Sequence, residues 1–347
     1  MILSILTRED ARTDGQTLVE RFGNSRLVPV VYAALMLVMP FLFAPGLVIE
    51  IMILGLFAMS FNILFGITGL LSFGHALFFG TGAYVAGYIS ITAGYPMVVV
   101  LGIVILTAIV LSIVVGALSL QLSDVYFAII TLAFAQFGHE MAYVLSEYTG
   151  GSDGMTGITR SSPFGLAVVD VTETIVFAYV VVFFTLVIGL FLYGLSNSLF
   201  GRTLKSIREN EDRTKTLGVN TYRVKVVAFV VAGTVAAIAG MLWSMYLQFI
   251  DPAVLYWTLS GDAVVSTIVG GMTSVFGPLV GTALLHTIED QLFTTQPGPL
   301  SVTTGGLLVL AGIASLSVAV GLGSRYGLGG PGTVELIVPI ATISAWT

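Results

Sequence analysis

Cysteine is absent from this chain of 347 residues, and charged side chains are scarce. Without cysteine, the chain can form no disulfide, thiolate nucleophile or cysteine-based metal site. Only 9% of the residues are charged and 56% are hydrophobic, whereas an ordinary soluble domain has about 25% charged residues. A chain with so few polar groups cannot cover a globular surface, so most of it must face lipid.

Positive charge is also limited, since the formal net charge is −6. A nucleic-acid partner would require a basic surface, so this class of partner is excluded. The histidines and carboxylates show no metal-ligand spacing on one helix, and we expect no metal and no cofactor of the chain's own. A G-x-x-x-x-G-K-[ST] phosphate loop is missing too, and a catalytic triad is disfavoured. We therefore expect a protein that is not an enzyme and that cannot hydrolyse ATP.

Long apolar segments are what the sequence has instead. A bilayer core of about 30 Å requires about 20 apolar residues per helical crossing. The chain therefore predicts an all-α, polytopic transmembrane helix bundle of about 8–10 spans, between a tail at residues 1–27 and a tail at residues 324–347. The transmembrane domain covers residues 28–323, with apolar segments at 28–44, 48–66, 70–92, 96–119, 125–147, 174–196, 226–249, 262–288 and 301–323.

Basic residues predict the orientation, because short loops rich in Lys and Arg stay in the cytoplasm. The loop 148–173 contains a single basic residue, Arg160, whereas the N-terminal tail and the segment 197–225 are rich in them. We expect a multi-pass protein of the cell membrane with a cytoplasmic N-terminus, an outer loop at 148–173 and a cytoplasmic segment at 197–225. The basic residues of that segment are Arg202, Lys205, Arg208, Arg213, Lys215, Arg223 and Lys225.

Glycines gather in two clusters, Gly66–Gly87 and Gly270–Thr282. Several glycines within one span predict a broken or re-entrant helix, which membranes tolerate where it faces protein or a water-filled cavity. The pattern Phe73-Gly74 with Gly80-Thr81 returns loosely as Phe276-Gly277 with Gly281-Thr282. This repetition suggests an internal duplication, as in many transporters.

The segment 197–225 predicts a short amphipathic helix over 203–216, with charges at mixed i, i+3 and i+4 spacing around few apolar residues. Gly218 suits the position just past a helix end, where a left-handed conformation is needed. Such a helix would be poorly stabilised alone and would gain by docking into a groove on a partner. The alternative is an ordinary basic loop that only fixes the topology.

The residues of this segment resemble a known family. The run Ser206-Ile-Arg-Glu-Asn-Glu211, followed by Leu217-Gly-Val-Asn220 and Arg223-Val-Lys225, is similar to the coupling segment of ABC importer permeases for branched-chain amino acids, of the LivM type, and of the related urea permeases. The similarity continues through Ala228–Gly240, the glycine clusters and the loop Gly150–Ile158, over about residues 48–292. Asp212-Arg213-Thr214 depart from the pattern, where the family tends to have small alanines, and the chain after Gly321 does not resemble the family's ending.

The resemblance implies a permease that translocates branched-chain amino acids delivered by an external binding protein. It also implies a second homologous permease subunit and two cytoplasmic ATPase subunits that bind the ATP. A urea or short-amide permease is the alternative substrate reading. A stand-alone secondary transporter is disfavoured, because it would require charged residues in mid-membrane. The resemblance implies which residues couple to the ATPases. They are Arg202, Lys205, Arg208, Glu209, Glu211 and Gly218.

Polar residues among the glycines are candidates for the translocation path. His75 lines this path in one interpretation; in the other it is a core residue bonded to a neighbouring backbone carbonyl. The candidate path residues are Ser72, Gly74, His75, Thr81, Gly82, Gly271 and Gly277.

Polar residues elsewhere in the spans are given structural roles. Asp262 is expected to cap a span at the outer surface and Glu50 to be interfacial. His139 and Glu140 are expected to be solvated, and Asn62, Gln136 and Gln248 to form interhelical hydrogen bonds.

Overall fold

The computed structural model describes residues 27–122, 124–160 and 173–293. This part of the chain is almost entirely helical, which confirms the all-α prediction. The predicted N-terminal tail up to residue 26, the span at 301–323 and the tail at 324–347 lie outside the described residues.

Among the described residues, 5 helices are long and apolar enough to cross a membrane. They are α3 (Pro45–Asn62, which continues as the π-helix η1, Ile63–Thr68), α5 (Met97–Ser119), α6 (Asp124–Val144), α8 (Thr174–Asn197) and α11 (Thr221–Leu247). Shorter helices complete the bundle: α2 (Leu27–Leu42), α4 (His75–Thr92), α12 (Trp257–Gly270) and α13 (Gly277–Phe293). At its ends lie α7 (Ser146–Thr149), η2 (Gly151–Asp153), β1 (Met155–Thr156), α9 (Leu199–Glu209), α10 (Glu211–Thr216), β2 (Phe249–Ile250) and η3 (Pro252–Leu255).

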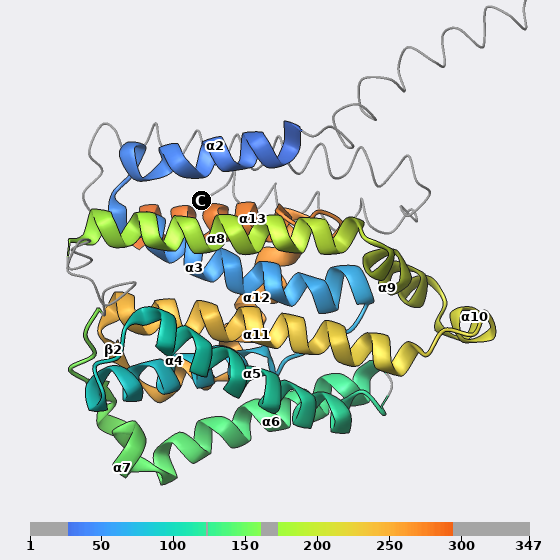
Figure 1. Ribbon diagram of the computed structural model, residues 1–347, viewed down its shortest axis with the longest axis horizontal. Helices are drawn as coiled ribbons and strands as arrows, with labels where there is room; N and C mark the ends of the chain where they lie inside the picture. The colour runs from blue at the N-terminus through green and yellow to red at the C-terminus, as the bar shows by residue number, and fades with distance from the viewer. Residues whose placement is uncertain (1–26, 123, 161–172, 294–347) are drawn as a thin grey trace, which may run out of the picture.

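The long helices lie side by side, so their connections gather at two opposite ends (Figure 1). At one end β1 pairs with β2, placing Met155 opposite Ile250, and the rings of Tyr88 and Tyr148 lie 6.0 Å apart. We call this the sheet end (residues 145–160 and 248–256). Helices α9 and α10 project from the opposite end, the α9 end (residues 198–220) (Figure 1). The described part of the weakly basic loop, residues 148–160, and the strongly basic segment thus lie at opposite ends of the bundle. Which end faces the cytoplasm stays a prediction.

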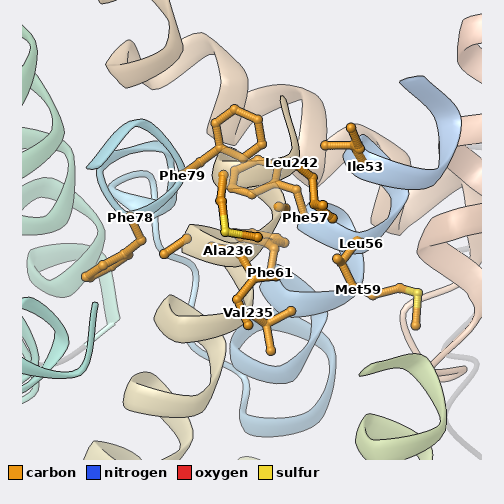
Figure 2. Close-up of a cluster of buried hydrophobic side chains, with 14 of the residues drawn as sticks. Ile53, Leu56, Phe57, Met59, Phe61, Phe78, Phe79, Val235, Ala236 and Leu242 are labelled. Atoms are coloured by element: carbon orange, nitrogen blue, oxygen red, sulfur yellow. The ribbon is translucent and has the colours of Figure 1, made fainter. Parts of the chain in front are cut away.

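The centre of the bundle consists of α3, α4 and α11. The apolar stretch of α3 is 83% buried and that of α11 67%, against 28% for α5 and 22% for α6. Side chains from the three central helices converge in one cluster, in which the rings of Phe57 and Phe79 lie 5.1 Å apart (Figure 2). The outer helices α5 and α6 present their apolar side chains to the surroundings, as a membrane requires.

Both glycine clusters break a helical path, which confirms the prediction of broken or re-entrant helices. The first path ends at Thr68, Gly69 takes φ +83°, and α4 begins only at His75. The second path ends at Gly270, Gly271 takes φ +96°, and α13 begins at Gly277. Each run therefore has the order helix, glycine in a positive-φ conformation, short linker, helix. An internal duplication stays a prediction.

The single span predicted over 262–288 is wrong, because the chain reverses within it. A Cβ atom on Gly270 would lie 1.9 Å from the carbonyl oxygen of Gly277, and one on Gly281 would lie 1.9 Å from that of Ser266. These pairs show that α12 and α13 run antiparallel as a hairpin. Apolar composition does not record this reversal, which depends on the backbone conformation of Gly271.

The contact between α4 and α11 depends on the absence of a side chain at Gly82. A Cβ atom there would lie 2.0 Å from the carbonyl oxygen of Ala237 on α11, and such overpacking costs about 1–3 kcal/mol. We expect Gly82→Ala to lower the thermal midpoint of the detergent-solubilised protein, measured by size-exclusion chromatography after heating. Gly102→Ala on α5, where nothing lies within 4 Å, is the matched control. Equal midpoints would contradict this prediction.

Candidate functional site

The predicted helix over 203–216 is two helices, α9 and α10. Ser198 caps α9 by accepting a 3.3 Å hydrogen bond from the backbone N–H of Gly201. Asn210 leaves the helical conformation, with φ −161° and ψ 103°, and its side-chain oxygen accepts a 2.8 Å bond from the N–H of Arg213. An asparagine in extended conformation is a favourable N-cap, so a second helix begins there.

The two faces of α9 have different surroundings. Leu204 and Ile207 are buried, with 1% and 4% of their surfaces exposed. The few apolar anchors of this helix are therefore used against its own bundle rather than kept for a partner, contrary to our expectation. Arg202, Lys205 and Glu209 are exposed, and their i, i+3, i+7 spacing places them on one stripe of the helix.

Arg208 does not belong to this free stripe. Part of its side chain is exposed, but its Nη1 donates a hydrogen bond to the carbonyl oxygen of Gly66 and its Nη2 lies 3.5 Å from the sulfur of Met272. Arg208 is thus exposed at the surface and at the same time bonded to two remote segments of the chain. Its partners are 142 residues before it and 64 residues after it, and nothing in the local sequence indicated them.

Glu211 is also engaged within the chain. Its carboxylate accepts hydrogen bonds from Lys225 Nζ and from Thr221 Oγ1, the latter at 2.9 Å, and lies 3.3 Å from Lys215 Nζ. Burial raises the pKa of Glu211, but the hydrogen bonds from Lys225 and Thr221 and the charge of Lys225 outweigh it, and the net pKa is lowered. Among the predicted coupling residues, Glu211 thus ties α10 to the first turn of α11.

Gly218 has the predicted left-handed conformation just after α10. Its φ is +85°, and its N–H donates a 2.9 Å bond to the carbonyl of Lys215. Before it, Leu217 leaves 77% of its surface exposed. The side chain of Leu217 is therefore available to a partner.

A groove of about 500 Å³ lies between α9–α10, the end of η1 and the link from α5 to α6. Both acidic and basic side chains line it, since Arg208, Glu209, Glu211 and Lys225 all border it. The remaining lining residues are Thr68, Gly69, Leu70, Leu120, Gln121, Leu122, Ile207, Asn210, Asp212 and Lys215.

The polar residues of the predicted path lie inside the bundle rather than along this groove. His75 is fully buried, and its Nε2 lies 2.8 Å from Ser60 Oγ. Because the Ser60 hydroxyl donates to the carbonyl of Phe57 at 2.6 Å, the histidine donates to Ser60. Its partner is therefore a hydroxyl and not the backbone carbonyl of the core interpretation. Ser72 is buried, and Thr81 bonds the carbonyl of Leu77 in its own helix.

The glycines of the predicted path occupy close backbone contacts. A Cβ atom on Gly74 would lie 2.2 Å from the carbonyl oxygen of Thr131, and one on Gly277 would lie 2.3 Å from that of Gly271. Together with Gly82, these positions are explained by packing between helices. A role of these residues in translocation stays a prediction.

Of the three residues expected to form interhelical hydrogen bonds, Asn62 forms one, whereas Gln136 and Gln248 have other roles in the described part of the chain. Asn62 Nδ2 does donate to the carbonyl of Ser274, 2.9 Å away and 212 residues later, which confirms that prediction. Gln136 instead donates to Glu140 within α6. Gln248 follows the end of α11 with φ +56°, where it caps that helix.

The remaining polar residues differ in part from their expected roles. Asp262 lies inside α12, whose N-cap is Tyr256, so it is not the predicted cap. His139 is not simply solvated, since its Nδ1 donates to the carbonyl of Pro252 at 2.9 Å. Glu50 accepts a 3.1 Å bond from Tyr246 near the sheet end.

Comparison with known proteins identifies relatives of the chain. Residues 44–312 match the family described as "Branched-chain amino acid transport system / permease component". The chain is 26% identical over 320 residues to the high-affinity branched-chain amino acid transport system permease protein LivM of Escherichia coli K12, covering 86% of this chain and 74% of that protein. It is 30% identical over 223 residues to a probable LivM of Methanocaldococcus jannaschii, covering 54% and 63%.

A sugar permease is also similar to the chain. The L-arabinose transport system permease protein AraH of Escherichia coli K12 is 26% identical over 191 residues, covering 53% of this chain and 56% of that protein. No solved structure matches the chain.

The contact between Glu211 and Lys225 generates a prediction on stability. Because the glutamate side chain is 32% exposed, solvent screens the pair, and we expect Glu211→Gln to lower the free energy of unfolding by about 1 kcal/mol. Because the pKa of Glu211 is lowered in the folded protein, its ionised carboxylate stabilises the fold at pH values above the ordinary pKa of 4.5. This contribution is lost as the pH falls through the lowered pKa. Thermal midpoints in detergent should therefore differ between wild type and variant at neutral pH and converge in acid.

The control for this pair is Asp212→Asn. Asp212 is 94% exposed and lies 3.6 Å from Lys215, so its loss should leave the midpoint unchanged at either pH. If Glu211→Gln behaves like this control at neutral pH, the tie between α10 and α11 does not stabilise the protein.

Proposed function

The chain belongs to the branched-chain amino acid permease family and is a membrane subunit of an ABC importer, and we propose that it translocates branched-chain amino acids delivered by an external binding protein. The alignment with the LivM relative extends over 86% of the chain, whereas that with the arabinose permease extends over 53%. The longer similarity favours amino acids over sugars as the substrate class.

The ATPase subunits dock on α9 and α10 in this proposal, and they bind the ATP. The observation that carries it is the exposed surface at the α9 end. Arg202, Lys205 and Glu209 form a charged stripe there, and Leu217 is 77% exposed. Charged side chains around an apolar anchor are the usual composition of a docking surface. Two such ATPases, a second homologous permease subunit and the binding protein complete the importer.

The α9 end faces the cytoplasm and the sheet end faces outside in this arrangement. The N-terminus is then cytoplasmic as well, in keeping with the positive charges near it. Only 28% of the apolar stretch of α5 and 22% of that of α6 are buried within the bundle. The outer surfaces of these two helices therefore face lipid or the second permease.

Single cysteines in this naturally cysteine-free chain test the orientation. Ser152 at the sheet end and Ser206 on α9 are both exposed. An impermeant thiol reagent added to intact cells should label Ser152→Cys, and Ser206→Cys should react only after the cells are opened. Labelling of Ser206→Cys in intact cells would contradict the proposed orientation.

Reconstitution tests the function. The purified chain alone in liposomes should not take up radiolabelled leucine, with or without an ion gradient, because energy must come from ATP hydrolysed by a partner. Uptake should appear when the second permease, the ATPases, the binding protein and ATP are added. Gradient-driven uptake by the chain alone would show a secondary transporter instead.

A further inference from the structure

Arg208 lies where three segments that are distant in sequence meet. The first is α9, which carries it, and the other two are the linkers of the glycine clusters, residues 69–74 and 271–276, which we call the inner turns. Its Nη1 donates to the carbonyl of Gly66 just before one inner turn, and its Nη2 lies 3.5 Å from Met272 in the other. A Cβ atom on Gly69 would lie 3.0 Å from Arg208 Cγ, so the arginine stem also packs on the first inner turn.

The end of α3 and η1 also contact the second inner turn directly. A Cβ atom on Gly66 would lie 2.2 Å from the carbonyl oxygen of Met272, so only a glycine permits this approach. Asn62, which is 1% exposed, donates a 2.9 Å hydrogen bond to the carbonyl of Ser274. A backbone carbonyl of η1 thus accepts a bond from α9, and one of the second inner turn accepts a bond from α3.

The inner turns belong to two elements that pack against each other. The first turn follows α3–η1, and the second connects the helices of the α12–α13 hairpin. The hairpin α12–α13 lies against α3, where a Cβ atom on Gly55 would lie 2.1 Å from Leu279 Cδ1. A close-packed contact of this kind does not deform continuously, so a displacement at its end is transmitted along it. Helix α9 is held to the same end of the bundle by the buried Leu204 and Ile207.

We propose that Arg208 and Asn62 form an inner latch that makes α3–η1 and the α12–α13 hairpin move as one unit when α9 is displaced. Arg208 is then a positioning residue that acts inside the permease and does not contact the ATPase. The stripe of Arg202, Lys205 and Glu209 receives the partner, and Arg208 passes the movement to the inner turns. This inference rests on the proposed function, in which ATPases dock on α9.

The importer assembled with its partner subunits in proteoliposomes provides the test, and the quantity measured is the amount of leucine transported per ATP hydrolysed. We expect Arg208→Ala to assemble with the ATPases and to hydrolyse ATP, while this ratio falls about tenfold. Arg208→Lys should recover part of the ratio, because an ammonium group can reach one acceptor but cannot span two. Arg223→Ala, which removes an exposed arginine near the same end, should resemble wild type.

A cross-link tests the latch independently of Arg208. The double variant Asn62→Cys with Ser274→Cys loses the hydrogen bond between α3 and the second inner turn, and its ratio should fall. A short, reducible bifunctional thiol reagent should then restore the ratio by joining α3 to this turn covalently, and reduction should abolish it again. The chain has no other cysteine to interfere.

Two results would overturn the latch. If Arg208→Ala loses the ATPases, or keeps the wild-type ratio, then Arg208 is a partner contact or has no role in coupling. If the cross-link blocks transport, α3 and the second inner turn separate during the cycle rather than move together. Failure of the proposed function is distinguishable from both, because the wild-type assembly itself would then show no ATP-driven uptake.

Discussion

Where a helix of this bundle breaks, the backbone hydrogen-bonding groups that it releases must find partners within the protein, and the architecture depends on how this is done. A continuous helix satisfies its own groups, but a broken one leaves carbonyls and N–H groups open. Here the carbonyl of Ser274 is bonded by Asn62, that of Gly66 by Arg208, and the N–H of Ala76 by Ser260 Oγ at 2.8 Å. The breaks are therefore stable only in the assembled bundle.

Small residues make these remote partners reachable. In lipid there is little hydrophobic driving force between helices, so association depends on close packing and on hydrogen bonds. Gly82 and Gly240 let α4 and α11 approach until backbone meets backbone: a Cβ atom on Gly240 would lie 1.8 Å from the carbonyl oxygen of Phe79. Between these contacts the hydrophobic cluster of Figure 2, which includes several phenylalanine rings, fills the remaining space. Glycine positions and aromatic positions are thus two parts of one packing arrangement.

The sequence predicted the features that depend on composition, local period and charge. The helical class, the opposite placement of 148–160 and 197–225, the breaks in the glycine clusters and the conformation of Gly218 follow from such local signals. The reversal at Gly271 and the division at Asn210 were missed, because each depends on one residue's backbone conformation. Contacts such as that of Arg208 with Gly66 could not be predicted, since they join residues 142 positions apart.

Helix α9 separates two requirements that would otherwise conflict. A surface that docks a partner can vary in charge, provided the partner varies with it, whereas a contact with the inner turns must match fixed backbone carbonyls. In the proposed function, the partner docks on one stripe of α9, which consists of Arg202, Lys205 and Glu209. The opposite face packs on the bundle through Leu204 and Ile207. Arg208 stands between them, and its planar guanidinium presents donors in two directions, which an ammonium group does not. In the proposed function, the geometry of the inner turns is therefore independent of the side chains that would recognise the partner.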